Sequence, residues 1–308
     1  MSDLTKIFEQ YKDTRFIFVQ PGGNWGDHLI YFGAEHLAAT LNLDFTTLTK
    51  QEFLNCNDFK DKIVYIHGGG GLNEWCSDSC FQCLEHAMTL GSKAFIYGPA
   101  TCSQNMDFLI PKLEKCFSTV NTSECYFFAR EETTYKLFND IECLNKHTQV
   151  LKDQDTAFFL SKQAVIDRIG EEKFTYDFYG FREDNESCGT KVTFSFKEVV
   201  FDPAMRCTSF EHWLKVHLHA RKIVTNRTHS SIIGCILQKP TYLFAGSYHK
   251  NFSIWTETMQ DKNINWLEPG VAFEYVSKGI WDIILPKKVK ASWKVRDFYL
   301  KSKGVPES

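Results

Sequence analysis

The sequence predicts an α/β protein made of two halves of similar size, each built on a parallel β-sheet. Short apolar runs alternate with segments of helical spacing, and several of these runs end in glycine-rich or polar loops. The alternation resumes after a charged stretch in the middle of the chain. Strands that alternate with helices predict a parallel sheet covered by helices on both faces.

The composition excludes several classes of protein. Of the 308 residues, 43% are hydrophobic and 24% are charged, values typical of a globular protein. The formal net charge of -3 argues against a nucleic-acid partner, because such proteins normally carry a basic excess. No apolar run is long enough to span a bilayer, and the first residues are polar. We therefore expect a cytoplasmic protein without a membrane span or a secretory signal.

The first half repeats the order strand, glycine loop, helix. Residues 15–20 form an apolar, aromatic run that ends at a Pro-Gly-Gly turn, and residues 27–41 have apolar side chains at helical spacing. The same order returns with a strand at residues 62–67, which runs into four glycines, and a helix over residues 74–90. The other elements expected in this half are strands at 93–97 and 125–129 and helices at 131–138 and 163–170.

We place a domain junction near residues 165–175, because a charged stretch there precedes new strands. The chain then divides into lobes of residues 1–170 and 171–308. The second lobe is expected to contain strands at 176–181, 192–196, 222–225 and 241–244 and helices at 210–220, 229–237 and 293–300. Two Rossmann-like lobes that face a cleft are the predicted architecture.

The loops after the strands are the candidate binding regions, since open α/β sheets bind ligands outside the carboxyl ends of their strands. The first of these loops contains Asn24, Gly26 and Asp27. Its glycines let the backbone approach a ligand, and the following helix offers free N–H groups to an anion. Asp27 also fits the plainer role of a helix cap, so both interpretations stay open.

Four consecutive glycines, Gly68 to Gly71, follow the strand at residues 62–67. Each glycine costs roughly 0.5 to 1 kcal/mol of chain entropy, which argues against a simple connector. We favour a backbone cradle for phosphate or carboxylate, with Gly69, Gly70 and Gly71 as binding residues, over a tight packing turn.

Arg130 ends the apolar strand at residues 125–129. At the carboxyl edge of a sheet its guanidinium is placed to bind an anionic ligand. The plainer alternative is a surface ion pair with Glu131 or Glu132.

Asn226, Arg227 and His229 lie between the strand at 222–225 and the helix that follows it. An arginine can form two hydrogen bonds to a carboxylate or phosphate, and a histidine can transfer a proton near neutral pH. Both side chains can therefore act on one anionic ligand. The nearby His217 and His219 alternate along a helix, and we expect them to be structural.

Cysteine spacing offers a rival interpretation. Cys76, Cys80 and Cys83 have the C-x3-C-x2-C spacing that holds an iron–sulfur cluster in radical enzymes, and His86 would complete a zinc site. The same spacing places all three thiols on one face of the helix expected at 74–90, and cysteine is among the most buried residue types. We therefore favour reduced thiols and expect no metal.

Five segments, four of which contain the loops above, together resemble the polysaccharide pyruvyl transferase family. GNWGD resembles the family's N-terminal G-N-x-G-D signature, and HGGGGL is similar to its glycine-rich segment. FFAREETT resembles the family's x-A-R-D-x-x-S turn, and DQDTAFFL resembles its D-P-A segment. The last segment, VTNRTHSSIIGCILQKPTYLF, resembles the family's R-L-H-x-x-I pattern. The five segments follow the family's order from residue 22 to about residue 250.

The resemblance implies a glycosyltransferase-B-like arrangement and transfer of a pyruvyl group from phosphoenolpyruvate onto two hydroxyls of a sugar, as a cyclic ketal. By position, Arg227 and His229 become the catalytic residues and Arg130 a phosphoenolpyruvate-binding residue. The substrate-binding residues expected beside them are Asn24, Asp27, Gly69, Gly70, Gly71 and Asn226. The first lobe becomes the acceptor side, and the second lobe carries the donor loop.

The expected partners are phosphoenolpyruvate and a sugar or glycan acceptor, as in exopolysaccharide biosynthesis. A lipid-linked acceptor would bring peripheral contact with a membrane. No cofactor is expected, because the reaction is acid–base chemistry with an anionic leaving group. Two alternatives stay open: a nucleotide-sugar-dependent glycosyltransferase of the same fold, and a non-catalytic relative that binds sugar phosphates.

Overall fold

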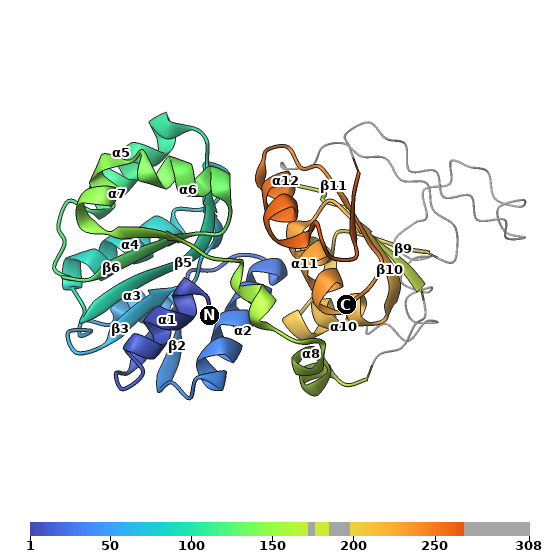
Figure 1. Cartoon of the computed structure of the whole chain (residues 1–308), viewed down its shortest axis with the longest axis horizontal. Coiled ribbons are helices and arrows are strands. Elements are labelled where there is room, and N and C mark those ends of the chain that lie inside the picture. Colours follow the sequence, from blue (N-terminus) through green and yellow to red (C-terminus); the bar gives the residue numbers. More distant parts are fainter. Residues whose placement is uncertain (172–175, 185–197, 268–308) are drawn as a thin grey trace, which may run out of the picture. The chain divides into compact units, whose positions relative to one another are not determined.

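The computed structural model describes residues 1–171, 176–184 and 198–267 (Figure 1). The chain divides into two compact units, one made of residues 1–23 and 27–160, the other of residues 24–26 and the chain from Ser161 onward. The division falls after Leu160, ahead of the 165–175 stretch where we placed the junction. The expected strand at 192–196 and helix at 293–300 lie outside the described residues.

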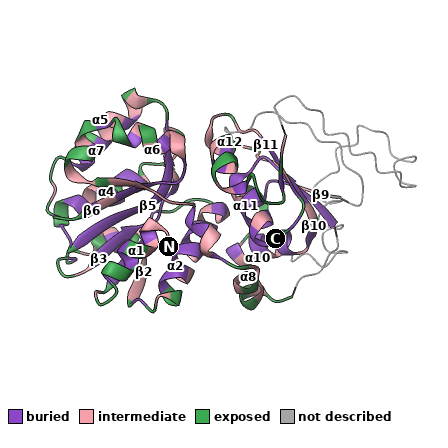
Figure 2. Ribbon diagram, viewed as in Figure 1, coloured by how far each residue is buried: buried purple, intermediate pink, exposed green. Residues whose placement is uncertain are grey.

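Within the described residues, a seven-stranded sheet forms the centre of the first unit, and all its pairs are parallel. The residues of its central strands are almost all buried, as Figure 2 shows for β3, β5 and β6. Its strands follow the order β2 (Phe45–Thr49), β1 (Phe16–Gln20), β3 (Ile63–Ile66), β5 (Ala94–Cys102), β6 (Cys125–Ala129) and β7 (Gln149–Lys152), with β4 (Gly69–Leu72) paired to β5.

Helices cover both faces of this sheet, because side chains alternate along each buried strand. In β1, Phe16 and Phe18 face one core while Ile17 and Val19 face the other. The first core is closed by α1 (Asp3–Gln10) and α2 (Trp25–Thr40). The helices that close the other core are α3 (Lys50–Asn55), α4 (Ser79–Leu90), α5 (Met106–Cys116), α6 (Glu132–Asn139) and α7 (Glu142–His147).

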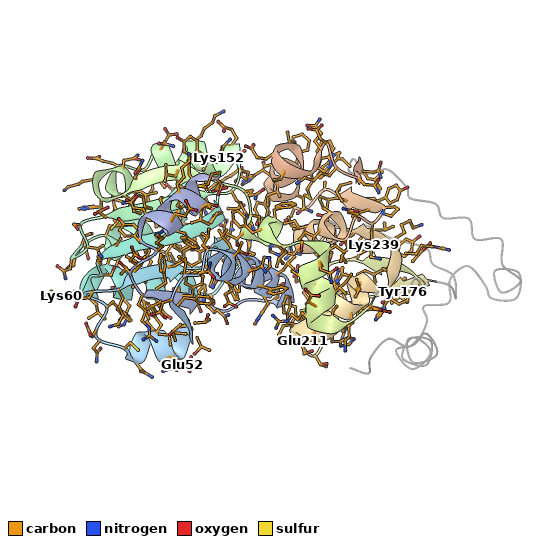
Figure 3. All side chains as sticks on the ribbon, turned by 60° about the horizontal axis from the view of Figure 1, so that its bottom comes forward. Glu52, Lys60, Lys152, Tyr176, Glu211 and Lys239 are labelled. Carbon is orange, nitrogen blue, oxygen red and sulfur yellow. The ribbon has the colours of Figure 1, made fainter. Side chains whose placement is uncertain are left out.

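The second unit contains a five-stranded parallel sheet within the described residues. Its strands follow the order β9 (Glu198–Val200), β8 (Tyr176–Gly180), β10 (Ala220–Thr225), β11 (Thr241–Phe244) and β12 (Ile264–Leu267). The helices are α8 (Lys162–Ile169), α9 (Pro203–Arg206), α10 (Phe210–Leu218), α11 (Thr228–Ile236) and α12 (Lys250–Ile254). Figure 3 labels Glu211 on α10, whose carboxylate lies 2.6 Å from Nη2 of Arg168 on α8.

Both sheets reverse their strand order next to their first strand, between β1 and β3 in the first unit and between β8 and β10 in the second. In the first unit the chain adds β2 on one side of β1 and then crosses to add β3 on the other side. In the second unit it adds β9 on one side of β8 and then crosses to add β10 on the other. In such sheets the loops at the carboxyl ends of the two central strands form the usual ligand site.

The predicted α/β class with parallel sheets is confirmed. The strands expected at 125–129 and 241–244 have the bounds of β6 and β11. Among the helices of the described ranges, none has both the length and the apolar character needed to cross a bilayer.

Candidate functional site

The strand reversal of the first unit brings two predicted binding segments together. Asp27 lies in the first turn of α2, which begins at Trp25, so Asp27 is inside the helix and not at its cap position. A Cβ placed on Gly69 would lie 3.3 Å from Asp27 Oδ1. Asp27, the last residue of the GNWGD segment, and Gly69 are therefore neighbours in the first unit, as expected for loops after β1 and β3.

Three of the four glycines lie in a strand, which corrects the prediction of a loop. Gly69 to Leu72 form β4, parallel to β5. A Cβ on Gly68 would lie 2.1 Å from Pro99 O, and one on Gly71 would lie 2.2 Å from Cys80 Sγ. Close packing against backbone thus favours glycine at Gly68, and a side chain at Gly71 would have to displace the Cys80 thiol, in line with the packing alternative. The ligand-binding role of Gly69, Gly70 and Gly71 stays a prediction.

Arg130 is held inside the first unit. Its Nη1 lies 2.6 Å from Asp155 Oδ2, and its Nε donates to Thr101 Oγ1 at 2.8 Å. Both members of the ion pair are only 1% exposed. The neighbouring Glu131 instead caps α6 by accepting hydrogen bonds from Thr133 N and Thr134 N. The alternative of a surface ion pair is therefore wrong, and a role of Arg130 in binding phosphoenolpyruvate stays a prediction.

The cysteine cluster is only partly helical, which corrects the prediction that all three residues share one helix. α4 begins at Ser79, so Cys76 precedes it, whereas Cys80 and Cys83 are buried on it. Burial raises the pKa of both the Cys80 and the Cys83 thiol to about 12. Within the described ranges, no three His, Cys, Asp or Glu side chains are grouped so as to hold a metal ion.

The strand reversal of the second unit holds a network of charged side chains. Arg227, which precedes α11, donates from Nε to Asp202 Oδ1 at 2.9 Å and from Nη2 to Asp202 Oδ2 at 2.5 Å. The same Nη2 lies 2.7 Å from Asp184 Oδ2. Asp202 is fully buried. The guanidinium of this predicted catalytic residue is thus fixed between two carboxylates at the carboxyl end of β10.

A second arginine, Arg182, meets Arg227 at the same carboxylate. Arg182 follows β8 and donates from Nε to Asp184 Oδ1 at 2.8 Å and from Nη2 to Asp184 Oδ2 at 3.1 Å. Its backbone N–H donates to Asn226 Oδ1 at 2.8 Å, so Asn226 joins the loops after β8 and β10. Sequence reasoning missed Arg182, Asp184 and Asp202, although the strand-end criterion that selected Arg227 also applies to Arg182.

His229 lies in the first turn of α11 and packs against Gly26. A Cβ on Gly26 would lie 2.6 Å from His229 Nδ1 and 2.9 Å from His229 Cβ. Asn24 Oδ1 accepts a hydrogen bond from Gly26 N at 2.8 Å, and Trp25 Nε1 donates to Cys207 O at 2.7 Å. The structure therefore brings Asn24 and His229 into one region of the second unit. Convergence of Arg130 with His229 stays a prediction.

The arrangement in the second unit suits one chemical task. The guanidinium groups of Arg182 and Arg227 can bind a phosphate or carboxylate, and the imidazole of His229, in the first turn of α11, can move a proton. The first-turn N–H groups of α11 add a favourable environment for an anion, since no side chain caps that helix.

Two solved structures match most of the chain. A functionally uncharacterized protein of Klebsiella pneumoniae matches with a TM-score of 0.62 and 18% identity, over 86% of this chain and 96% of that one, which shows a shared fold. The heptosyltransferase WaaC of E. coli, with ADP, matches with a TM-score of 0.40 and 10% identity, over 82% of this chain and 93% of that one.

No curated protein matches the chain significantly. The family model of polysaccharide pyruvyl transferase, however, matches residues 6–248, a range that contains all five sequence segments that resemble the family. The chain therefore belongs to the polysaccharide pyruvyl transferase family.

Proposed function

We propose that the chain transfers the pyruvyl group of phosphoenolpyruvate onto two hydroxyls of one sugar in a glycan or glycan precursor, forming a cyclic ketal. The observation that carries this proposal is the placement of Arg227 and His229 at the start of α11, where the strand order of the second sheet reverses. Family membership supports a transferase that acts on a sugar.

The donor requires a strongly cationic site. Phosphoenolpyruvate carries a phosphate and a carboxylate on a three-carbon frame, so a complementary site needs guanidinium groups or N–H groups on more than one side. Arg227 supplies a guanidinium whose orientation is fixed by Asp202. Such prior fixing lowers the entropy cost of binding.

The reaction requires one proton carrier. One sugar hydroxyl adds to C2 of phosphoenolpyruvate while C3 takes up a proton, and the second hydroxyl then displaces phosphate. Of the two hydroxyl protons, one ends on C3 as part of the new methyl group and one leaves with phosphate. His229 carries the first proton from the hydroxyl to C3 and returns to its starting state. The reaction written in this way needs no cofactor.

A labelled-donor assay tests the proposal. The protein is incubated with phosphoenolpyruvate labelled at C3 and with panels of nucleotide-linked, lipid-linked and polymeric sugars. We expect label in one acceptor class, as a ketal, together with one phosphate released per ketal. Parallel incubations supply nucleotide sugars and the same acceptors. Glycosyl transfer without pyruvyl transfer would support the glycosyltransferase alternative, and neither activity, with binding of sugar phosphates alone, would support a non-catalytic relative.

A further inference from the structure

We propose that Arg182 and Arg227 together bind the anionic group of the donor, and that Asp184 occupies this place when no ligand is bound. The identity of the anion as part of phosphoenolpyruvate rests on the function proposed above. The existence of an anion site at the β8–β10 reversal does not, because the charges and contacts of the second unit support it by themselves.

The two arginines come from different strands and converge on one carboxylate. Arg182 forms two hydrogen bonds with Asp184 through Nε and Nη2, and Arg227 reaches Asp184 Oδ2 through Nη2 at 2.7 Å. Both guanidinium side chains are only 8% exposed. A carboxylate held by two nearly buried guanidinium groups reproduces the contacts that an anionic ligand would make there.

The two aspartates of the network differ in how easily a ligand can displace them from the arginines. Asp202 is fully buried and also accepts hydrogen bonds from Glu183 N at 2.9 Å and Ala204 N at 3.1 Å, so its carboxylate fixes three loops. The Asp184 side chain is 33% exposed and sits on the solvent side of the network. Asp184 is therefore the carboxylate that a ligand can replace, while Asp202 stays to orient Arg227.

The charge balance favours such an exchange. The two arginines and two aspartates of the network sum to zero charge, so departure of Asp184 would remove one of the two negative charges that face these nearly buried guanidinium groups. An incoming phosphate or carboxylate restores the balance and takes over the same donors. Ligand binding thus exchanges one set of charge-assisted hydrogen bonds for another, and Asp184 competes with the ligand.

The location agrees with this role. Arg182 follows β8 and Arg227 follows β10, the two strands between which the order of the second sheet reverses. The hydrogen bond from Arg182 N to Asn226 Oδ1 holds the two loops in register. We therefore expect a substitution of Arg182 to alter ligand binding and to leave proton transfer by His229 unchanged.

Direct titration of the full chain with inorganic phosphate and with phosphoenolpyruvate tests the proposal. Asp184→Asn removes the competing charge at constant size, and we expect both ligands to bind about 10-fold to 100-fold more tightly. Arg182→Gln should weaken both by a similar factor, and Arg182→Lys should recover part of the loss, because the charge returns without the two-pronged geometry. Melting curves of each variant establish that the variant is folded.

Glu183→Gln is the matched control. It removes the same charge from the neighbouring residue, whose partner is the exposed Arg206 at 2.8 Å, and we expect anion affinity within about twofold of wild type.

Unchanged or weaker binding in folded Asp184→Asn would overturn the proposal, as would unchanged binding in Arg182→Lys and Arg182→Gln. Tighter phosphate binding in Asp184→Asn without any pyruvyl transfer by the wild type would support the anion site and contradict the proposed function. Pyruvyl transfer by the wild type, with anion affinity unchanged in both Asp184→Asn and Arg182→Gln, would support the proposed function and contradict the anion site.

Discussion

Arg130 and Asp155 form an ion pair inside the first unit, with 2.6 Å between Nη1 and Oδ2 and with both side chains 1% exposed. The pair joins the end of β6 to the short 3₁₀ turn at Thr156–Phe159. It thereby connects two segments that resemble the family separately in sequence, FFAREETT and DQDTAFFL.

Breaking this pair should cost stability. Asp155→Asn leaves the Arg130 charge buried without compensation, and we expect the free energy of unfolding to fall by about 3 to 5 kcal/mol in urea titrations. Glu211→Gln breaks the exposed pair with Arg168 and serves as the control, with an expected loss of about 1 kcal/mol or less. An Asp155→Asn protein as stable as wild type would show that the pair is not what fixes Arg130.

The packing role of Gly71 can be separated from a ligand role. Gly71→Ala places a methyl group 2.2 Å from Cys80 Sγ, and we expect a loss of about 1 to 3 kcal/mol in the free energy of unfolding. Cys80→Ala removes the clashing sulfur, so the double variant should lose less than the sum of the single variants. Cys83→Ala, on the same helix, is the control that should show additive losses. Additivity with Cys80→Ala as well would refute the packing explanation.

The contact between Gly26 and His229 should govern activity. Gly26→Ala places a methyl group 2.6 Å from His229 Nδ1, so the imidazole must move, and we expect pyruvyl transfer to fall by about 100-fold. Alanine is favoured over glycine within helices such as α2, but His229 Cβ would also lie only 2.9 Å away, so a melting curve of the variant establishes that it is folded. Gly246→Ala is the control, since its nearest neighbour, Asn251 Nδ2, would lie at an ordinary 3.4 Å. Equal activity of the two variants would contradict this role of the contact.

Two buried histidines should make the protein less stable in acid. Burial lowers the pKa of both His67 and His217 from 6.5 to about 3, so the folded protein keeps them neutral where the unfolded chain is protonated. Their contribution to stability is present above pH 6.5 and is lost as the pH falls towards 3, at about 1.4 kcal/mol per pH unit for each histidine.

His67→Phe isolates one of these contributions. The His67 ring lies among the rings of Phe18, Tyr31 and Tyr65, and its two nitrogens have no hydrogen-bond partner among the described residues, so phenylalanine should be accommodated. We expect the slope of unfolding free energy against pH to become shallower between pH 6.5 and 5. A variant with the wild-type slope would show that His67 is not the titrating group.

Local sequence patterns were sufficient for the strands of both sheets whose apolar runs are bounded by turn residues, such as β6 and β11. They were not sufficient for β4, because a run of glycines carries no strand signal and the close approach of Gly68 to Pro99 in β5 is a tertiary contact. β2, with the sequence FTTLT, escaped notice for a related reason, since its half-buried polar residues do not form an apolar run.

The candidate site was predictable only in part, because the partners of charged residues depend on tertiary structure. The rule that ligands bind at the carboxyl ends of parallel strands selected Arg130 and Arg227, and both residues do follow the ends of strands, β6 and β10. Their carboxylate partners, Asp155 and Asp202, each lie 25 positions away in sequence, and no local pattern connects them. Arg182 was open to the same rule and was overlooked.

Arg227 should affect donor binding more than the chemical step. Arg227→Lys keeps a positive charge beside Asp202 but loses the two-pronged geometry, so we expect weaker donor affinity with turnover at saturating donor less affected. The measurements are direct titration with phosphoenolpyruvate and the dependence of transfer rate on donor concentration. A variant with unchanged donor affinity would remove Arg227 from the donor site.

The most direct test of the proposed reaction is the rate of ketal formation by His229→Ala at saturating phosphoenolpyruvate, measured alongside donor affinity by titration. If His229 carries the proton to C3, turnover should fall by roughly two to four decades while donor affinity remains. His147→Ala, in the last turn of α7, is the control that should keep wild-type turnover. Wild-type turnover in His229→Ala would contradict the proposed mechanism.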